Sequence, residues 1–178
     1  MLFRSAESVK NSYSWMHNEK SAHTATWIVQ CKDLFASKTA GFENSVRCDQ
    51  PVYSVFNDYT HEDILAGNSS GGRVGWSAIT LTFQVLGASL PLLIKGVGTN
   101  TVIKNPMQIM MLTQRDKPVV SHQIDLTGCN IVEFGAHSNY MMRVAFQKGA
   151  YSVNVFDETG IKIGCTSVEI DYVKSTQK

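Results

Sequence analysis

The sequence has no long hydrophobic run, no signal-like leader and no closely spaced pair of cysteines. Its longest apolar run, residues 90–94, contains Pro91 and is far shorter than the roughly 20 residues of a membrane-spanning helix. Residues 1–7 contain no apolar signal-peptide core, so we expect no cleavable signal peptide and no membrane insertion. The four cysteines, at positions 31, 48, 129 and 165, lack CxxC spacing, and we expect reduced thiols in a cytoplasmic chain.

Charge is also scarce. The chain has 16 Lys and Arg residues against 15 Asp and Glu residues, and only 17% of its residues are charged. Without a basic field, nucleic-acid binding is not expected. A low charged fraction suits a protein whose surface is covered by copies of itself or by partners.

The histidines and acidic residues do not have the spacing of a metal site. The five histidines are scattered, at positions 17, 23, 61, 122 and 137. His61 and Glu62 lack the second histidine, four residues on, that a zinc-binding helix needs. Asp58, Glu62 and Asp63 do not have the spacing of a calcium-binding EF-hand, and a solvated acidic loop explains them better.

A catalytic triad is not expected either. His122, Asp125 and Cys129 carry the right chemical groups for thiol catalysis. Residues three apart on a strand point to opposite faces, however, so His122 and Asp125 would diverge. We therefore predict no catalytic residue, no metal and no cofactor.

What the sequence does contain is a succession of short strands and one short helix. The expected strands are residues 24–31, 51–56, 74–84, 107–114, 119–126, 130–134, 140–147, 150–156, 161–165 and 168–173. The apolar alternation changes parity between Ala78 and Ile79, which indicates a bulge or bend near Ser77. Residues 32–47 have a turn-like composition. The order predicts a mostly β fold: a closed antiparallel β-barrel, or a tightly packed two-sheet sandwich, with one short flanking α-helix.

Two parts of the chain differ in composition. Residues 1–23 are polar and mixed, and they indicate an N-terminal arm whose aromatic residues dock on something. Residues 24–178 are long enough for a core and are expected to form a single β-barrel domain.

The helix is predicted from its ends and its apolar spacing. Ser89 is a favourable N-cap, and Pro91 lies in the first turn, where its missing N–H costs nothing. Gly98 marks the end of the helix. The predicted buried stripe consists of Leu90, Leu93, Ile94 and Val97.

The order of these elements, over roughly residues 24–173, resembles the haemolysin-coregulated protein (Hcp) family, the tube subunits of bacterial type VI secretion systems. The motifs that carry the resemblance begin at Gly72-Arg73-Val74 and continue through the strand at 79–84 and the helix start Ser-Leu-Pro-Leu-Leu at 89–93. The strand at 107–112, the Asp-Lys turn at 116–117, and the strands at 121–126 and 130–132 follow in the family's order. The arm, the long connection at 32–50 and the absence of paired tryptophans in the second strand depart from the family.

The resemblance implies a hexameric ring that stacks into a hollow tube, which a contractile sheath drives out of the cell. It implies that the partners are other copies of the chain, the sheath, the spike or baseplate proteins, and effector cargo. It also implies a cytoplasmic stage before export. The long loop at 57–72 takes the place of the family's assembly loop, which bridges neighbouring rings. Its candidate residues are Asp58, Tyr59, His61, Glu62, Asp63, Asn68 and Arg73.

A second hypothesis is a separate β-sandwich or jelly-roll module that binds carbohydrate or peptide. In that case exposed aromatic residues such as Trp15, Trp76 and Tyr172 would line the ligand-binding face.

The loop at 57–72 should control contacts between rings and not the folding of the subunit, because it carries too few apolar residues to anchor a core. Replacing Glu62 and Asp63 with lysine should leave the thermal unfolding transition nearly unchanged and alter ring stacking or export. Calorimetry together with electron microscopy of assemblies checks this. A large loss of subunit stability would contradict the assignment.

Overall fold

The computed structural model describes residues 25–36, 43–57, 74–99, 102–113, 119–157 and 161–171, and the structural statements below concern these residues. The strands are β1 (Thr26–Gln30), β2 (Ser45–Cys48), β3 (Val55–Asn57), β4 (Val74–Trp76), β5 (Ile79–Phe83), β6 (Met107–Thr113), β7 (Val119–Thr127), β8 (Asn130–Ala136), β9 (Tyr140–Ala145), β10 (Lys148–Phe156) and β11 (Lys162–Asp171). A 3₁₀ turn, Gly87–Ser89, leads into the helix α3 (Leu90–Thr99).

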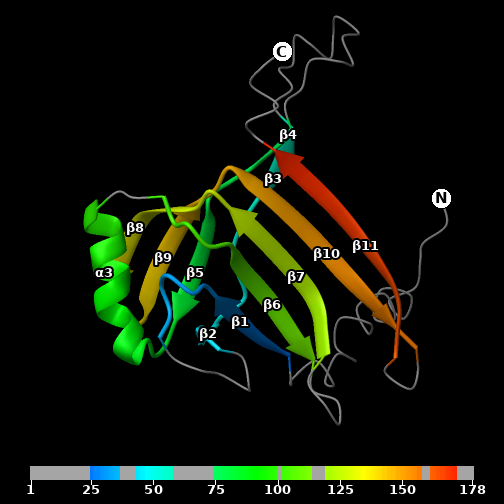
Figure 1. The fold of residues 1–178 in the computed structure, drawn as a ribbon, viewed down its shortest axis with the longest axis horizontal. Helices are drawn as coiled ribbons and strands as arrows, with labels where there is room; N and C mark the ends of the chain where they lie inside the picture. Colours follow the sequence, from blue (N-terminus) through cyan, green and yellow to red (C-terminus); the bar gives the residue numbers. More distant parts are fainter. Residues whose placement is uncertain are drawn as a thin grey trace, which may run out of the picture.

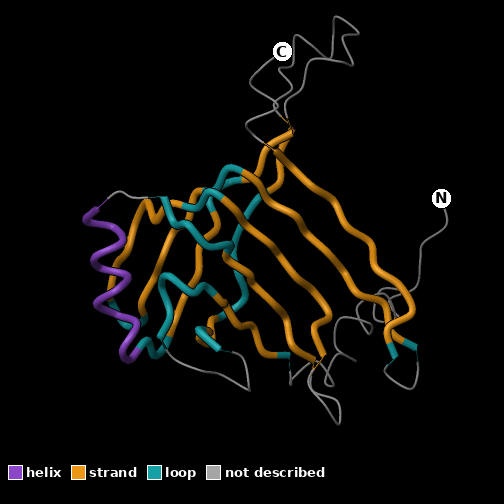
Figure 2. The backbone as a smooth tube through the Cα atoms, viewed as in Figure 1, coloured by secondary structure: helices purple, strands orange, loops and turns teal. Residues whose placement is uncertain are grey.

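The strands form two main antiparallel sheets that pack as a sandwich. The larger sheet has the order β11-β10-β7-β6-β1-β2, and the smaller has the order β5-β9-β8. The hairpin β3–β4 forms a third, two-stranded unit. The helix α3 lies beside β8 at one end of the molecule, and the β10–β11 hairpin lies at the other (Figure 1, Figure 2). The fold is therefore the two-sheet form of the predicted architecture, and the described strands do not close into a barrel.

The chain passes from the large sheet to the small sheet between β7 and β8, and it returns to the large sheet between β9 and β10. These two connections contact each other. Gly128 links β7 to β8 with a φ of 64°, a backbone conformation that side chains disfavour. A Cβ at this position would also collide with the Gln147 side chain. The N–H of Gln147 donates to the carbonyl of Thr127 at 3.0 Å, which ties the two connections together.

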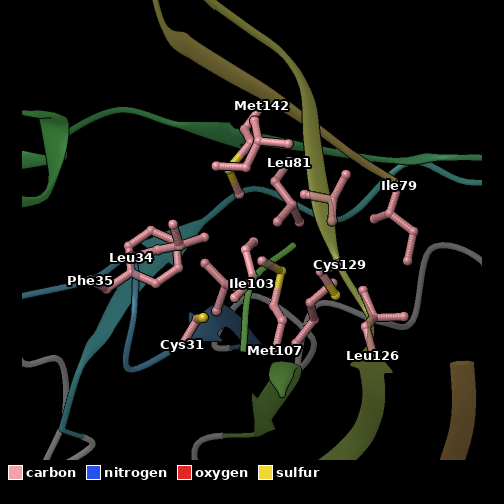
Figure 3. Close-up of a cluster of buried hydrophobic side chains, with 14 of the residues drawn as sticks. Cys31, Leu34, Phe35, Ile79, Leu81, Ile103, Met107, Leu126, Cys129 and Met142 are labelled. Atoms are coloured by element: carbon pink, nitrogen blue, oxygen red, sulfur yellow. The ribbon is translucent and has the colours of Figure 1, made fainter. Parts of the chain in front are cut away.

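The core lies between the two sheets. In β5, Ile79, Leu81 and Phe83 alternate with half-buried threonines and are fully buried. They face side chains of the large sheet such as Ile109 and Ile124. Figure 3 shows how side chains from both sheets and from the connecting segments point toward one another. This burial of alternate residues supplies the main driving force for folding.

Two of the four free cysteines belong to this core. Cys31 and Cys129 are buried, and burial raises the pKa of the Cys129 thiol to about 12, with nearby Cys31 adding to the rise. A thiol of this kind stays protonated at neutral pH and packs as a small apolar side chain.

The structure differs from the sequence prediction in three strands. The expected strand at 51–56 is shorter and later, because only β3, Val55–Asn57, pairs with β4 there. Residues 45–48, predicted as part of a turn-like segment, form β2, where Val46 is buried in the core. The expected strands at 161–165 and 168–173 are one continuous strand, β11, because each of its residues keeps a partner on β10 apart from one irregularity near Phe156. The bend predicted near Ser77 is present, and it is a change of sheet: β4 pairs with β3, whereas β5 pairs with β9.

The helix follows its predicted start but not its predicted stripe. Ser89 lies immediately before α3, is buried, and its hydroxyl accepts a hydrogen bond from the N–H of Ala36 at 3.1 Å. Pro91 lies in the first turn and is exposed. The prediction that Ile94 belongs to the buried stripe is wrong: Leu93 is fully buried, whereas Ile94 is 56% exposed. At about 100° per residue, Leu90, Leu93 and Val97 gather on the side of α3 that meets the core, and Ile94 lies at the edge of that side, next to solvent.

The helix can approach the small sheet closely because it has a glycine on the contact side. Gly96 faces β8, and a Cβ there would lie 3.0 Å from Cδ1 of Ile131. Leu90 and Val97 pack against the core from the same side. The helix extends to Thr99, one residue beyond Gly98, where the sequence predicted its end. No helix of the described residues is long and apolar enough to cross a membrane.

Replacing Leu93 with alanine should destabilise the protein by about 2–5 kcal/mol, because the side chain is fully buried between α3 and the core. The matched control is Ile94→Ala, one residue away in the same helix, which should cost less than about 1 kcal/mol. Urea unfolding of the two variants measures the difference. Equal losses would show that α3 is not packed as described.

Candidate assembly surfaces

The predicted assembly loop is held at both ends by one hairpin. Its seven candidate residues, at positions 58 to 73, lie outside the described residues. The strands that flank the loop are β3 and β4, paired as Val55↔Trp76, Phe56↔Gly75 and Asn57↔Val74. The two ends of the loop therefore emerge side by side from one hairpin.

A glycine at the centre of the hairpin lets an aromatic ring pack across it. The Phe56 ring lies across Gly75, and a Cβ at that position would come within 2.8 Å of the ring. Phe56 is half exposed, so it covers the hairpin instead of entering the core. The pair is a cross-strand contact that fixes the two strands close to the loop.

The base of the hairpin is held by a group of aromatic rings, which we term the aromatic anchor: Tyr53, Trp76, Phe146 and Tyr151. Tyr53 stacks on Trp76 with ring centres 5.5 Å apart and planes at 17°. Trp76 meets Phe146 and Tyr151 edge-on, at 5.9 Å and 6.5 Å. Because Tyr151 belongs to β10, the aromatic anchor joins the hairpin to the large sheet.

His122 extends this aromatic contact across the large sheet. Its ring lies 6.1 Å from that of Tyr151 and 6.4 Å from that of Trp27. Burial lowers the pKa of His122 below its ordinary value, and burial also raises the pKa of Tyr151, with Tyr53 beside it adding to the rise. The environment thus favours the neutral form of both rings, as expected of a packing contact.

The residues that could have formed a thiol triad have separate surroundings. His122 is among aromatic rings, whereas the Asp125 carboxylate accepts hydrogen bonds from the side-chain amides of Gln108 and Gln123 at 2.7–2.8 Å. Cys129 is buried with a raised pKa. Across the described segments, no three His, Cys, Asp or Glu residues gather as metal ligands would.

The second candidate surface is the β10–β11 hairpin. β7 pairs with β10 only from Lys148 to Val153, so the remainder of β10 pairs with β11 alone. The Lys148 ammonium lies 2.9 Å from the Asp171 carboxylate and pairs the two strands at one end of the hairpin. In Figure 1 the hairpin projects beyond the small sheet.

This hairpin exposes apolar side chains on an unpaired edge. Val155, Ile161, Ile163 and Val168 are 46–66% exposed, and β11 has a neighbour on one side only among the described strands. An apolar edge strand readily accepts another chain. Sequence reasoning missed this surface because it divided β11 into two strands; the alternating Ile163–Val168 segment was the available signal.

Comparison with known proteins identifies the fold. No family model and no curated protein sequence matches the chain. Among solved structures, Hcp1 from Salmonella typhimurium matches with 14% identity and a TM-score of 0.64, over 85% of this chain and 97% of its own. A type six secretion system protein matches with 12% identity and a TM-score of 0.68, over 84% and 96%. A type VI secretion system effector from Yersinia pestis matches with 17% identity and a TM-score of 0.59, over 82% and 98%. The chain therefore has an Hcp-like fold, with a divergent sequence.

The folded state should lose stability as the pH falls below about 6.5, because the unfolded chain, with the ordinary histidine pKa of 6.5, takes up a proton more readily than half-buried His122 does. The stability due to neutral His122 is fully present above that pH. The variant His122→Asn should show a smaller loss between about pH 7.5 and 5.5 than the wild type. His137→Asn, which removes an exposed imidazole, is the control. Urea unfolding at each pH provides the measurement, and identical pH slopes for wild type and His122→Asn would contradict the prediction.

Proposed function

We propose that the chain is the structural subunit of a hollow tube, built from rings of six copies and exported by a contractile, type VI-like secretion apparatus. The observation that carries the proposal is the extent of the fold match. The match covers 96–97% of the length of two solved structures, one of which is titled Hcp1 and the other a type six secretion system protein. Fold alone does not imply function, so the proposal also depends on the two candidate assembly surfaces.

The β10–β11 hairpin supports contact between subunits within a ring. Its exposed Ile163 and Val168 would be unfavourable in water, and burial against a neighbour removes about 25 cal/mol of unfavourable free energy per Å² of apolar surface. In a ring, this edge would meet a different surface of the next copy. Head-to-tail contacts of this kind form a ring when the rotation between copies closes.

The β3–β4 hairpin supports contact between rings. A loop whose two ends leave adjacent, anchored strands is presented as a unit from a fixed base. Glu62 and Asp63 within the loop would pair with basic residues of the next ring. The loop residues named above, from Asp58 to Arg73, therefore remain the proposed stacking contacts.

The remaining features of the proposal follow from the tube role. The subunit would be made in the cytoplasm and exported without a cleavable signal peptide. Its partners would be further copies, the sheath, the spike or baseplate proteins, and effector cargo in the lumen. No catalysis and no cofactor are proposed.

The alternative, a carbohydrate- or peptide-binding sandwich, has lost one of its three proposed ligand-face aromatics. Trp76 is 6% exposed and packs in the aromatic anchor, so it cannot line an open binding face. Trp15 and Tyr172 lie outside the described residues.

Purified protein should form rings, and the double variant Ile163→Asp, Val168→Asp should abolish them, because two desolvated carboxylates would oppose burial of the hairpin. Light scattering after size exclusion, together with negative-stain images, measures the assembly. The variant should remain a folded monomer, because both side chains are more than half exposed in the single chain.

The control is Ile94→Asp, which replaces an equally exposed apolar residue on α3, at the far end of the sandwich. This variant should still form rings. Wild-type protein that stays monomeric at high concentration would overturn the tube proposal. Rings that persist in the double variant would overturn the role of the hairpin.

A further inference from the structure

The large sheet has a second apolar cluster, on the face that points away from the small sheet. In β6, Met107 and Ile109 belong to the main core, whereas Met110 and Leu112 belong to a separate cluster with Ile28 of β1. Val120 of β7 packs against this cluster, and we term the four residues Ile28, Met110, Leu112 and Val120 the outer patch. The register places Ile28 opposite Met110, and Leu112 opposite Val120, so the patch runs across three strands.

The outer patch is as inaccessible to water as the main core. Ile28 is 0% exposed, and Met110 and Leu112 are each 4% exposed. On a sheet face with nothing packed above it, neighbouring side chains cover the sides of a side chain but leave its tip exposed to water. Burial this complete therefore requires a layer of chain above the patch.

The described elements do not supply that layer. The small sheet contributes its buried side chains to the main core, and Leu93 of α3 also belongs there. Among the described apolar side chains, only those of the large sheet itself contact the outer patch. Further along the same face of the sheet, Cys165, Ser167 and Glu169 of β11 are exposed. The covering is thus confined to the strands β1, β6 and β7.

We propose that the N-terminal segment of the same chain, residues 1–24, docks on the outer patch and forms a third layer. The segment ends directly before Ala25, three residues from Ile28, so it enters the sheet beside the patch. Twenty-four residues reach up to about 80 Å when extended, and three strands are only about 10–15 Å across. This inference does not depend on the proposed tube function.

The composition of the segment fits an apolar surface. It contains Leu2, Phe3, Val9, Tyr13, Trp15 and Met16. The connection between β6 and β7, residues 114–118, also borders the patch, but its sequence is Gln-Arg-Asp-Lys-Pro. Residues 37–42, which precede β2, offer one large apolar side chain, Phe42. Residues 1–24 are the longest stretch outside the described residues and enter β1 directly.

Oxidation of the Met110 thioether can be used to measure whether the outer patch is covered. Peroxide oxidises exposed methionines and spares buried ones, and Met107 on the opposite face serves as an internal standard. In the full-length chain, both residues should be oxidised slowly. In the variant Tyr13→Ser, Trp15→Ser, Met16→Ser, the oxidation rate of Met110 should rise at least about tenfold, while that of Met107 stays unchanged. Peptide mapping by mass spectrometry separates the two sites.

The control is Phe42→Ser, which removes an aromatic residue from the other candidate segment and should leave Met110 protected. Rapid oxidation of Met110 in the wild type, no change in the triple variant, or exposure caused by Phe42→Ser alone would each overturn the proposal. Protection of Met110 that weakens on dilution would overturn docking within the same chain, because it would assign the covering to a second copy. Unchanged slow oxidation of Met107 in each variant shows that the sandwich core is intact, so a folding failure does not confuse the result.

Discussion

The large sheet is wider than the small sheet that packs on it. This difference in width determines which apolar side chains of the large sheet stay exposed to solvent. The three-stranded small sheet covers only part of the six-stranded large sheet. The inner face of β1, β6 and β7 is therefore buried, whereas most of β11 extends beyond the core. A monomer therefore keeps Val168 in water although it lies on the same face as the core residue Ile124, two strands away. This exposed extension is the physical basis of the self-assembly that we propose, since association would bury the apolar surface that folding of one chain leaves exposed.

The aromatic anchor solves a separate problem. The β3–β4 hairpin has only three residue pairs, and an isolated hairpin of that size is marginal in water. Stacking of Tyr53 on Trp76, and of Trp76 against Phe146 and Tyr151, attaches the hairpin to the large sheet and fixes where the long loop emerges. The same contacts leave His122 half buried, and burial lowers the pKa of its imidazole.

The two faces of the large sheet illustrate how far sequence pattern alone can be interpreted. Strands β6 and β7 have apolar residues on both faces of the sheet, as strands that are covered on both sides do. In the sequence, the apolar residues from Met107 to Leu112 indicate a buried strand, but they do not show which elements cover its two faces. The structure assigns Met107 and Ile109 to the sandwich and Met110 and Leu112 to the outer patch. That assignment is the basis for our proposal that the N-terminal segment covers the outer patch.

The sequence by itself determined most of the described strands, the helix α3 with Leu93 buried, the bend near Ser77 and the resemblance to Hcp proteins. These features depend on local alternation, caps and the order of elements. It did not determine β2, the continuity of β11, the exposure of Ile94 or the burial of Trp76. Each of these depends on which partner a strand or helix meets in space: β2 is held by pairing with β1, and Trp76 is covered by Tyr53, Phe146 and Tyr151. Local propensity does not depend on contacts between residues that are distant in the sequence. Only the tertiary structure therefore decided which apolar side chains lie in the core and which lie on the surface.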